Sequence, residues 1–354
     1  MKIKLAILEK DTSYLGRIVS VFGTKYTDKF EVYSFTDMSV AISNIESNRI
    51  DVLVASTEFN VDVDKLPSRC GFAYFVDSID IDTYNDQRAI CKFQKADLIY
   101  KQILSIYSEN AGSISGLKIG DENSRVVIFS GVAGGTGTSS AAVACAIHYS
   151  NMGKKVLYVN FDKFGTSDSF LSAEGQFDMS DIIFALKSKK SNISLKLESC
   201  VKQDARGVFF YSGSKLALDM QELGAEDIVH FLDEIKISGG YDYIIMDMEF
   251  RLDKNSIEIH KQAHSIVWVS DGSEIANGKI IRAYESLMVK EQSDDLRIVD
   301  RICMMYNKFS NKASHIIEGL SVRDIGGAPR FEYASTEQVI GQLSGMQMFD
   351  VVVK

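Results

Sequence analysis

The sequence predicts an α/β protein made of two consecutive domains, each built on a mainly parallel sheet. Short apolar runs alternate with amphipathic stretches along most of the chain, and a segment rich in Ser, Gly, Asn and Glu separates two such series. The length of 354 residues also exceeds what one ordinary core accommodates. We therefore place the first domain at 1–108, a linker at 109–124 and the second domain at 125–354.

The first series of elements predicts a compact domain of five strands with intervening helices. Each predicted strand is a short apolar run, and each predicted helix carries apolar residues at helical spacing. The predicted strands are 4–8, 30–34, 51–55, 72–76 and 89–93, and the predicted helices are 13–22, 38–46 and 95–107.

The second series begins at Arg125 and again alternates apolar strands with helical stretches. The last residues, 341–354, carry one lysine and a β-branched run, which suits core packing better than a basic membrane-binding helix. The predicted strands are 126–129, 156–160, 208–211, 243–247, 265–269 and 301–306.

Composition argues against several classes of protein. Hydrophobic residues at 45% and charged residues at 25% are typical of a soluble globular chain. No apolar run reaches the ~18 to 20 residues of a membrane span, and residues 1–11 read as a strand and its loop rather than a signal peptide. We therefore expect a cytoplasmic protein without a transmembrane segment. A net charge of −9 argues against direct DNA binding, which depends on Lys and Arg neutralising phosphates.

Cysteines and clustered lysines indicate no further site. The five cysteines are widely spaced and form no C-x-x-C motif, so we expect small buried side chains rather than disulfides or zinc ligands. They are Cys70, Cys91, Cys145, Cys200 and Cys303. One group of lysines could make a local basic patch, but a solvated helix end and loop is the preferred interpretation. The group comprises Lys187, Lys189, Lys190 and Lys196.

The most informative stretch, 125–150, is an apolar strand that runs into a glycine-rich turn and then a helix of small residues. Gly134, Gly135 and Gly137 would let backbone N–H groups close around phosphate oxygens, toward which the helix start points its partial positive charge. Ser139 takes the place of the hydroxyl that binds Mg²⁺ in such loops. Because βα turns also use glycine where nothing binds, the turn needs support from elsewhere in the chain.

Three later strands end in polar residues at the edge where open α/β sheets bind ligands. The second predicted strand of this domain is followed by Asp162, and the strand YIIM ends in Asp247, which fits a Walker B carboxylate. The last predicted strand ends in Asn307 and Lys308, where a base-binding loop would lie. A single carboxylate of this kind is more often a helix cap, but their order on successive strands favours a nucleotide site.

The loop sequence VAGGTGTSS resembles the deviant Walker A motif of MinD/ParA P-loop ATPases, K-G-G-x-G-K-[ST], within a likeness that covers about residues 124–350. The resemblance implies a P-loop NTPase fold that binds ATP and Mg²⁺, with the metal at Ser139 and, through water, at Asp247. It also implies that Asp162 positions the attacking water, that Asn307 recognises adenine, and that a segment containing Pro329 lies beside the base. The implied ATP-binding residues are Ala133, Gly134, Gly135, Thr136, Gly137, Thr138, Ser139, Ser140, Asn307, Lys308 and Pro329.

Two departures from that motif concern charge. Ala133 stands where the family has its signature lysine, and Thr138 stands where it has the ordinary Walker lysine. Asn160 also replaces the first carboxylate of the family's D-x-D. Such lysines stabilise charge that develops on the β and γ phosphates, so we expect binding to survive and hydrolysis to be weak or absent.

The first domain resembles a response-regulator receiver, a flavodoxin-like fold, without its phosphorylation chemistry. A receiver carries an acidic pair after its first strand, and here the sequence is Glu9, Lys10, Asp11. Its phosphorylated aspartate ends the third strand, where this chain has Ser56. The family's lysine after the fifth strand is matched by Lys92 or Lys95, although a surface charge explains either equally well. The domain is therefore interpreted as a docking or dimerising module.

A receiver-like domain followed by a MinD-like domain is the arrangement of the TadZ/CpaE group, which helps place Tad-type pilus machinery at a cell pole. The resemblance implies a homodimer recruited to the pole or the inner membrane face by other pilus or secretion assembly proteins. Two alternatives stay open. One is an active ParA/MinD-type ATPase in DNA partition or division-site placement, and the other is a scaffold that binds no nucleotide.

Overall fold

A computed structural model of the protein describes residues 2–110, 124–165, 167–188, 192–294 and 296–353. The chain divides into two compact units, of which the first comprises Met1–Gly116 with Phe184–Cys200 and the second comprises Leu117–Ile183 with Val201–Lys354. Most of the predicted linker lies outside the described residues, so the domain boundaries stay a prediction. The grouping of Phe184–Cys200 with the first unit has no counterpart in the sequence pattern.

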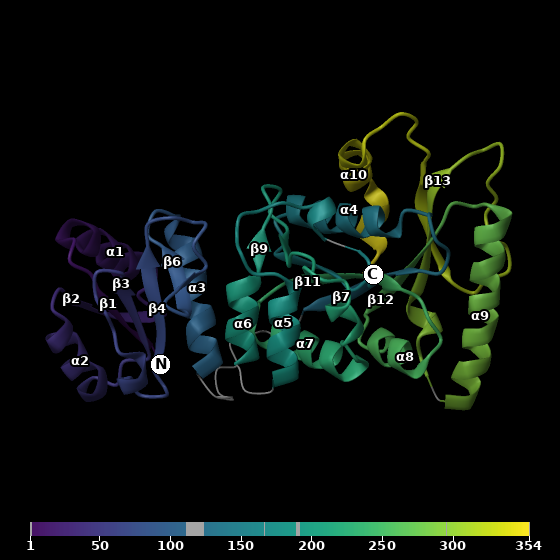
Figure 1. The fold of residues 1–354 in the computed structure, drawn as a ribbon. Coiled ribbons are helices and arrows are strands. Elements are labelled where there is room, and N and C mark those ends of the chain that lie inside the picture. Colours follow the sequence, from purple (N-terminus) through teal and green to yellow (C-terminus); the bar gives the residue numbers. More distant parts are fainter. Residues whose placement is uncertain (1, 111–123, 166, 189–191, 295, 354) are drawn as a thin grey trace. The chain divides into compact units, whose positions relative to one another are not determined.

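The first unit is built on a sheet that is parallel except at one edge (Figure 1). Its strand order is β2-β1-β3-β4-β6-β5, and the two-residue β5 pairs antiparallel with β6. The central strands β1 and β3 lack exposed side chains, because helices or loops cover both faces. The strands are β1 (Ile3–Leu8), β2 (Phe30–Phe35), β3 (Val52–Ser56), β4 (Gly71–Val76), β5 (Thr83–Tyr84) and β6 (Gln87–Cys91).

Two apolar cores lie on the two faces of this sheet. Helices α1 (Thr12–Lys25) and α3 (Ala96–Asn110) pack on one face, and α2 (Met38–Ser47) packs on the other with the loop around Phe59. Asp11 begins α1 by accepting hydrogen bonds from the backbone of its first turn, and Asp37 begins α2 in the same way. Between β3 and β4 the only helical turn is η1 (Val63–Lys65).

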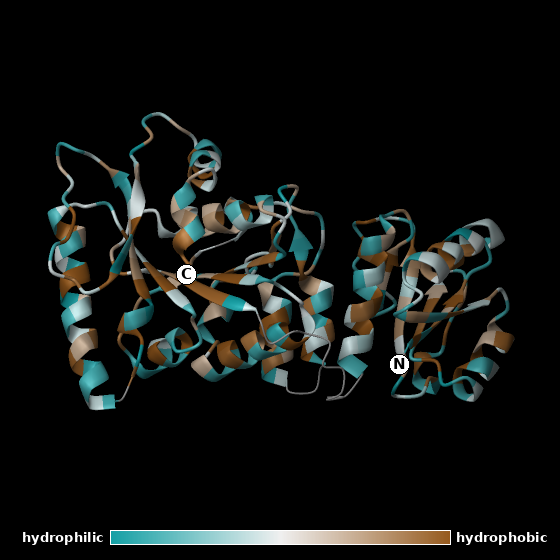
Figure 2. Ribbon diagram, turned by 180° about the vertical axis from the view of Figure 1, so that it is seen from behind, coloured by the Kyte–Doolittle hydropathy of each residue, from teal (hydrophilic) through white to brown (hydrophobic). Residues whose placement is uncertain are grey.

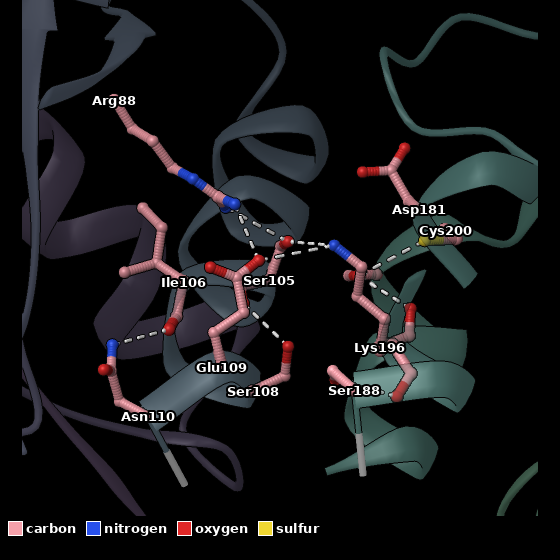
Figure 3. Close-up of polar contacts among 12 residues, drawn as sticks. Arg88, Ser105, Ile106, Ser108, Glu109, Asn110, Asp181, Ser188, Lys196 and Cys200 are labelled. Atoms are coloured by element: carbon pink, nitrogen blue, oxygen red, sulfur yellow. Dashed lines mark hydrogen bonds and ion pairs between the residues drawn. The ribbon is translucent and has the colours of Figure 1, made fainter. Parts of the chain in front are cut away.

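Helix α6 (Ile193–Cys200) packs against α3 within this unit. Figure 3 shows the α6 side chain Lys196 pointing toward two residues of α3. Its ammonium donates a hydrogen bond to Ser105 Oγ at 2.8 Å and lies 3.6 Å from a carboxylate oxygen of Glu109. Arg88 bonds the same carboxylate at 2.7 Å. Buried ammonium groups require such partners, since desolvation otherwise disfavours the charge.

The interpretation of the four lysines as a solvated helix end is therefore wrong for Lys196, which is only 3% exposed. A basic surface patch containing Lys196 is excluded for the same reason. The physical cause is the packing of α6 on α3, a contact between segments far apart in sequence. Lys187 is exposed, and Lys189 and Lys190 lie outside the described residues.

The second unit has a larger sheet in the order β14-β13-β12-β7-β11-β8-β10-β9, parallel except for the antiparallel pair β9 and β10. Strand β7 (Arg125–Gly131) lies in the middle, between β11 and β12. Figure 2 shows the strands of this sheet as largely hydrophobic, as expected for strands covered on both faces. The others are β8 (Val156–Asn160), β9 (Lys202–Gln203), β10 (Phe209–Phe210), β11 (Tyr243–Glu249), β12 (Ser265–Ser270), β13 (Ile302–Phe309) and β14 (Arg323–Pro329).

Helices α4 (Thr138–Asn151) and α10 (Thr336–Ser344) cover one face of this sheet, and α7 (Ala225–Ser238) and α8 (Lys254–His260) lie at the opposite face (Figure 1). Helix α5 (Met179–Ser188) and the long α9 (Glu274–Asp294) complete the elements. The C-terminal side chains Phe349 and Val352 are fully buried beside α4, which confirms the predicted core packing. No helix of the described residues is both long enough and apolar enough to cross a bilayer.

The predicted fold class is confirmed, and so is the burial of all five cysteines. The sequence missed β5, β9 and β14, because two-residue strands leave no periodic signal and β14 contains two glycines. The predicted strand 208–211 is reduced to two residues, and the predicted strand 89–93 ends at Cys91. This earlier end places Lys92 in the loop beyond the sheet edge.

Candidate phosphate-binding site

The glycine-rich turn between β7 and α4 leaves the start of that helix without a capping side chain. Gly135 and Gly137 adopt left-handed backbone conformations, with φ of 80° and 86°, which glycine reaches without strain. Gly137 is the N-cap residue of α4, and the first turn of the helix carries no acidic residue. The first N–H groups of a helix have no partner within the helix and favour a bound anion. The start of α4 therefore has the uncapped geometry that an anion site uses.

Hydroxyl groups fill the interior of this turn. Thr136 is 1% exposed, and its hydroxyl donates to the carbonyl oxygen of Ala133 at 3.3 Å. The same hydroxyl lies 3.3 Å from that of Thr138. Ala133 is buried. The two positions that carry lysine in the Walker motif thus contribute a methyl group and a hydroxyl, and the turn brings no ammonium of its own.

Asp247 lies within β11, which continues two residues beyond the predicted strand end, to Glu249. The Asp247 carboxylate accepts hydrogen bonds from Tyr158 Oη at 3.0 Å and from Asn160 Nδ2 at 3.3 Å. Burial raises the pKa of Asp247 to about 6, against the opposing effect of the Ser139 and Tyr158 hydrogen bonds and with a further contribution from the Asp162 charge. The structure thus brings Ser139 and Asp247 together.

Asn160 connects Asp247 to Asp162. Strand register pairs Asn160 with Asp247, and the Asn160 side chain accepts a hydrogen bond from the Asp162 backbone at 2.8 Å while its amide faces Asp247. Asp162 in turn accepts from the backbone N–H of Phe164 at 3.1 Å. The asparagine that replaces the family's carboxylate is therefore 7% exposed and hydrogen-bonded on both sides.

Tyr158 is a member of this site that sequence reasoning missed. Its hydroxyl lies in the core and donates to the Asp247 carboxylate. A signal was present in the sequence, because a tyrosine inside a buried strand needs a hydrogen-bond partner and Tyr158 shares a sheet face with Asn160, two residues later.

The polar pair at the end of β13 contacts the turn itself. Asn307, 1% exposed, donates from Nδ2 to the carbonyl oxygen of Thr136 at 2.9 Å, and Lys308 Nζ donates to the carbonyl oxygen of Gly135 at 2.8 Å. A side chain at Gly137 would collide with the Asn307 amide. Pro329, the last residue of β14, pairs with Phe309 and so ends at the same sheet edge. Of the predicted nucleotide residues outside the turn, Asn307 and Lys308 therefore contact it, and Pro329 lies on the neighbouring strand.

A second group of carboxylates lies at the corresponding edge of the first unit, and a lysine neutralises it. Lys92 Nζ lies 2.8 Å from Glu9 and 3.6 Å from Asp77. Burial lowers the pKa of the Lys92 ammonium, but the hydrogen bond and charge of Glu9, with those of Asp77, raise it by more. Asp11 caps α1, and Ser56, where a receiver carries its aspartate, is fully buried. Lys92 is therefore an ion-pair partner of Glu9 rather than a simple surface charge, and its match to the receiver family's lysine stays a prediction.

Comparisons with known proteins assign a family to the first domain and a fold to the second. Residues 1–108 match the family model described as "TadZ-like, receiver domain". A ParA family ATPase from Chlorobium tepidum superposes with a TM-score of 0.50 and 20% identity, over 65% of this chain and 97% of that one. No curated protein sequence matches the chain.

Two further solved structures are similar at lower scores. The septum site-determining protein MinD complexed with Mg-ADP from Pyrococcus horikoshii has a TM-score of 0.47 and 17% identity, over 62% of this chain and 94% of that one. A putative plasmid partition protein from Borrelia burgdorferi bound to AMPPNP has a TM-score of 0.43 and 16% identity, over 63% and 91%. The first domain is thus a TadZ-like receiver, and the rest of the chain has the fold of ParA-type P-loop ATPases.

Proposed function

We propose that this chain, with a TadZ-like receiver domain ahead of a ParA-type fold, binds Mg·ATP as a dimerising localisation and assembly factor with weak or absent hydrolysis. The observation that supports this most directly is the uncapped start of α4, whose second residue is Ser139, together with the buried carboxylate of Asp247. One feature suits phosphate and the other suits a cation, and Mg·ATP supplies both.

The residues fit this group without rearrangement of the sheet. Backbone N–H groups of the turn would hold the phosphates, and Ser139 would bind the metal directly while Asp247 holds one of its waters. Within the described part of the chain, no ion pair joins Asp247 to a lysine or arginine. Bound Mg²⁺ would supply the charge that this carboxylate lacks. Asn307 and Pro329 would lie at the adenine.

The expectation of slow hydrolysis rests on charge. Asp162 stays at the position from which a carboxylate can hold a water molecule, so the chain keeps a group that could support cleavage. The turn lacks both lysines, and one contact that stabilises developing charge contributes ~3 to 4 kcal/mol. We infer that ATP acts chiefly as a ligand that stabilises the bound form by mass action.

The cellular role rests on the first domain. A TadZ-like receiver supports recruitment to the cell pole or the inner membrane face through other pilus or secretion assembly proteins. The active ParA/MinD-type ATPase remains the second candidate, because Asp162 and Asp247 are both retained.

Calorimetry with ATP, in the presence and absence of Mg²⁺, tests the binding. Ser139→Ala should weaken Mg·ATP binding by about tenfold or more, in line with the loss of a hydrogen bond to a charged group, and Ser286→Ala, on the exposed face of α9 and outside the turn, serves as the matched control. An unchanged dissociation constant for Ser139→Ala would reject the metal assignment. Absence of any binding by the wild type would favour the nucleotide-free scaffold.

Light scattering tests the dimer. MinD-like domains pair across the nucleotide, and the bare Gly134-Gly135 turn, where no atom would obstruct an added Cβ, leaves room for a second chain. We expect the mass of a dimer with saturating Mg·ATP, and a monomer under those conditions would reject dimerisation. Product analysis of the same samples then separates a slow binder from an active ATPase.

A further inference from the structure

The lysine that contacts the phosphate turn comes from another strand. The turn has Ala133 and Thr138 at the positions where the Walker motif carries lysine. Lys308, at the end of β13, instead extends to the turn and bonds the carbonyl oxygen of Gly135 at 2.8 Å. We propose that Lys308 supplies the positive charge toward the nucleotide phosphates that the turn lacks. This inference rests on the proposed function and assigns one more residue of the same site.

The backbone at Lys308 is held in a conformation that lysine seldom adopts. Its φ is 56°, in the left-handed region that L-residues other than glycine occupy uncommonly. The neighbouring residue fixes it, because the buried Asn307 amide bonds the carbonyl oxygen of Thr136. Two consecutive side chains therefore bond two consecutive carbonyl groups of the turn. Backbone strain of this kind persists where the surroundings enforce it, commonly at ligand sites.

The side chain lies along the part of the turn that ends at the helix start. A Cβ placed on Gly137, the N-cap residue of α4, would lie 3.4 Å from Lys308 Cε. The glycine is therefore required for the approach of Asn307, and Lys308 lies at contact distance from the same position. The ammonium group thus reaches the same turn whose backbone N–H groups favour an anion.

The ammonium of Lys308 retains donors for a ligand. It has three N–H groups, of which the bond to Gly135 uses one. No ion pair within the described residues engages it. Burial raises the pKa of Asp271, the residue after β12, but hydrogen bonds that involve Ser273 and, to a smaller extent, the Lys308 charge lower it overall. A cation on a flexible four-carbon stem can turn from a carbonyl to a phosphate oxygen, with which it makes a stronger, charge-assisted hydrogen bond.

A series of ligands distinguishes two roles for Lys308. Its charge could bind phosphate, or its hydrogen bond to Gly135 could only hold the turn in shape. We expect Lys308→Gln to lose affinity for Mg·ADP and for pyrophosphate by about 10- to 100-fold, the range of one hydrogen bond between charged groups. Affinity for adenosine should change less than about twofold, because adenosine carries no phosphate. Lys308→Arg keeps the charge and should stay within about threefold of the wild type.

A second variant tests whether the loss of affinity in Lys308→Gln comes only from a collapsed turn. Thr138→Lys in the Lys308→Gln background should restore at least about tenfold of the lost affinity, because it returns an ammonium to the Walker position. Equal loss for adenosine and ADP, or no loss in Lys308→Gln when the wild type binds ADP, would overturn the assignment to Lys308. Failure of the wild type to bind ADP, adenosine and pyrophosphate would instead reject the proposed function, and this inference with it.

Discussion

The two units place carboxylates at equivalent sheet edges, yet only one of them supplies its own cation. In the first unit Glu9 is 1% exposed and Lys92 lies 2.8 Å from it. In the second unit Asp247 is 3% exposed and contacts hydroxyl and amide groups instead. A buried carboxylate without a cation is unfavourable, since desolvation penalises its charged form. The comparison indicates that the first carboxylate has an internal cation and that the second has none among the described residues.

The two units also differ in whether their carboxylates could hold a metal ion. The Lys92 ammonium sits between Glu9 and Asp77, where a receiver would need room for a divalent cation. Asp247 keeps a raised pKa and a neighbouring hydroxyl, so a metal ion would relieve an existing cost. A TadZ-like receiver domain whose carboxylate is paired with a lysine thus precedes a domain whose buried carboxylate has no such partner among the described residues.

The largest expected effect comes from giving the second site internal cations. We predict that Ala133→Lys combined with Thr138→Lys raises ATP turnover by about 10⁴- to 10⁶-fold, because each lysine contact to developing phosphate charge is worth ~3 to 4 kcal/mol. Phosphate release under single-turnover conditions measures it. A wild-type rate already typical of an active ATPase would contradict the view that this chain holds ATP without cleaving it.

The next effect comes from removing the cation of the first site. Lys92→Met should lower the free energy of unfolding by about 3 to 5 kcal/mol, because it leaves Glu9 buried and uncompensated. Chemical denaturation of the full chain, monitored at the first unit, measures the change. The double variant Glu9→Gln, Lys92→Met should recover most of the loss.

The matched control for Lys92→Met is Lys10→Met, which breaks the exposed 3.6 Å pair with Glu58. That change should stay within about 0.5 kcal/mol, as for most surface positions. Equal effects of Lys92→Met and Lys10→Met would mean that Glu9 tolerates its charge without Lys92. The difference drawn between the two units would then be wrong.

The variant Asp247→Asn tests the buried carboxylate of the second unit in the absence of any ligand. Because the folded-state pKa of Asp247, about 6, lies above the ordinary value of 3.8, protonation favours folding; this stability is fully present below about pH 4 and is lost as the pH rises to about 6. Asparagine removes that loss, so the variant should be more stable than wild type by about 2 to 3 kcal/mol at pH 7.5 and equal to it near pH 4. A gain that does not depend on pH would reject the buried charge as its cause.

The fold was predictable, and so was the position of Ser139 and Asp247 at one edge of the sheet, because β7, which leads into α4, and β11 are parallel neighbours. The rest depends on long-range contacts that leave no local pattern. Helix α6 joins the first unit through its packing on α3, and Asn307 bonds the turn through the position of β13 beside β12. The sequence assigned Asn307 to adenine, and its bond to Thr136 adds a structural role that no spacing indicates.

The smallest expected effect concerns Ser56, the residue at the receiver's phosphorylation position. Its hydroxyl is buried and accepts only a long 3.4 Å hydrogen bond from the Glu58 backbone, so Ser56→Ala should change the free energy of unfolding by less than about 1 kcal/mol. Serine forms no acyl phosphate, and Lys92 already neutralises Glu9. Incubation with acetyl phosphate and Mg²⁺ should therefore add no mass to the wild-type protein. A phosphoryl group that is found on the first unit of the wild type but not of Ser56→Ala would contradict this prediction. It would show that the sheet edge of the first unit also takes up a phosphoryl group.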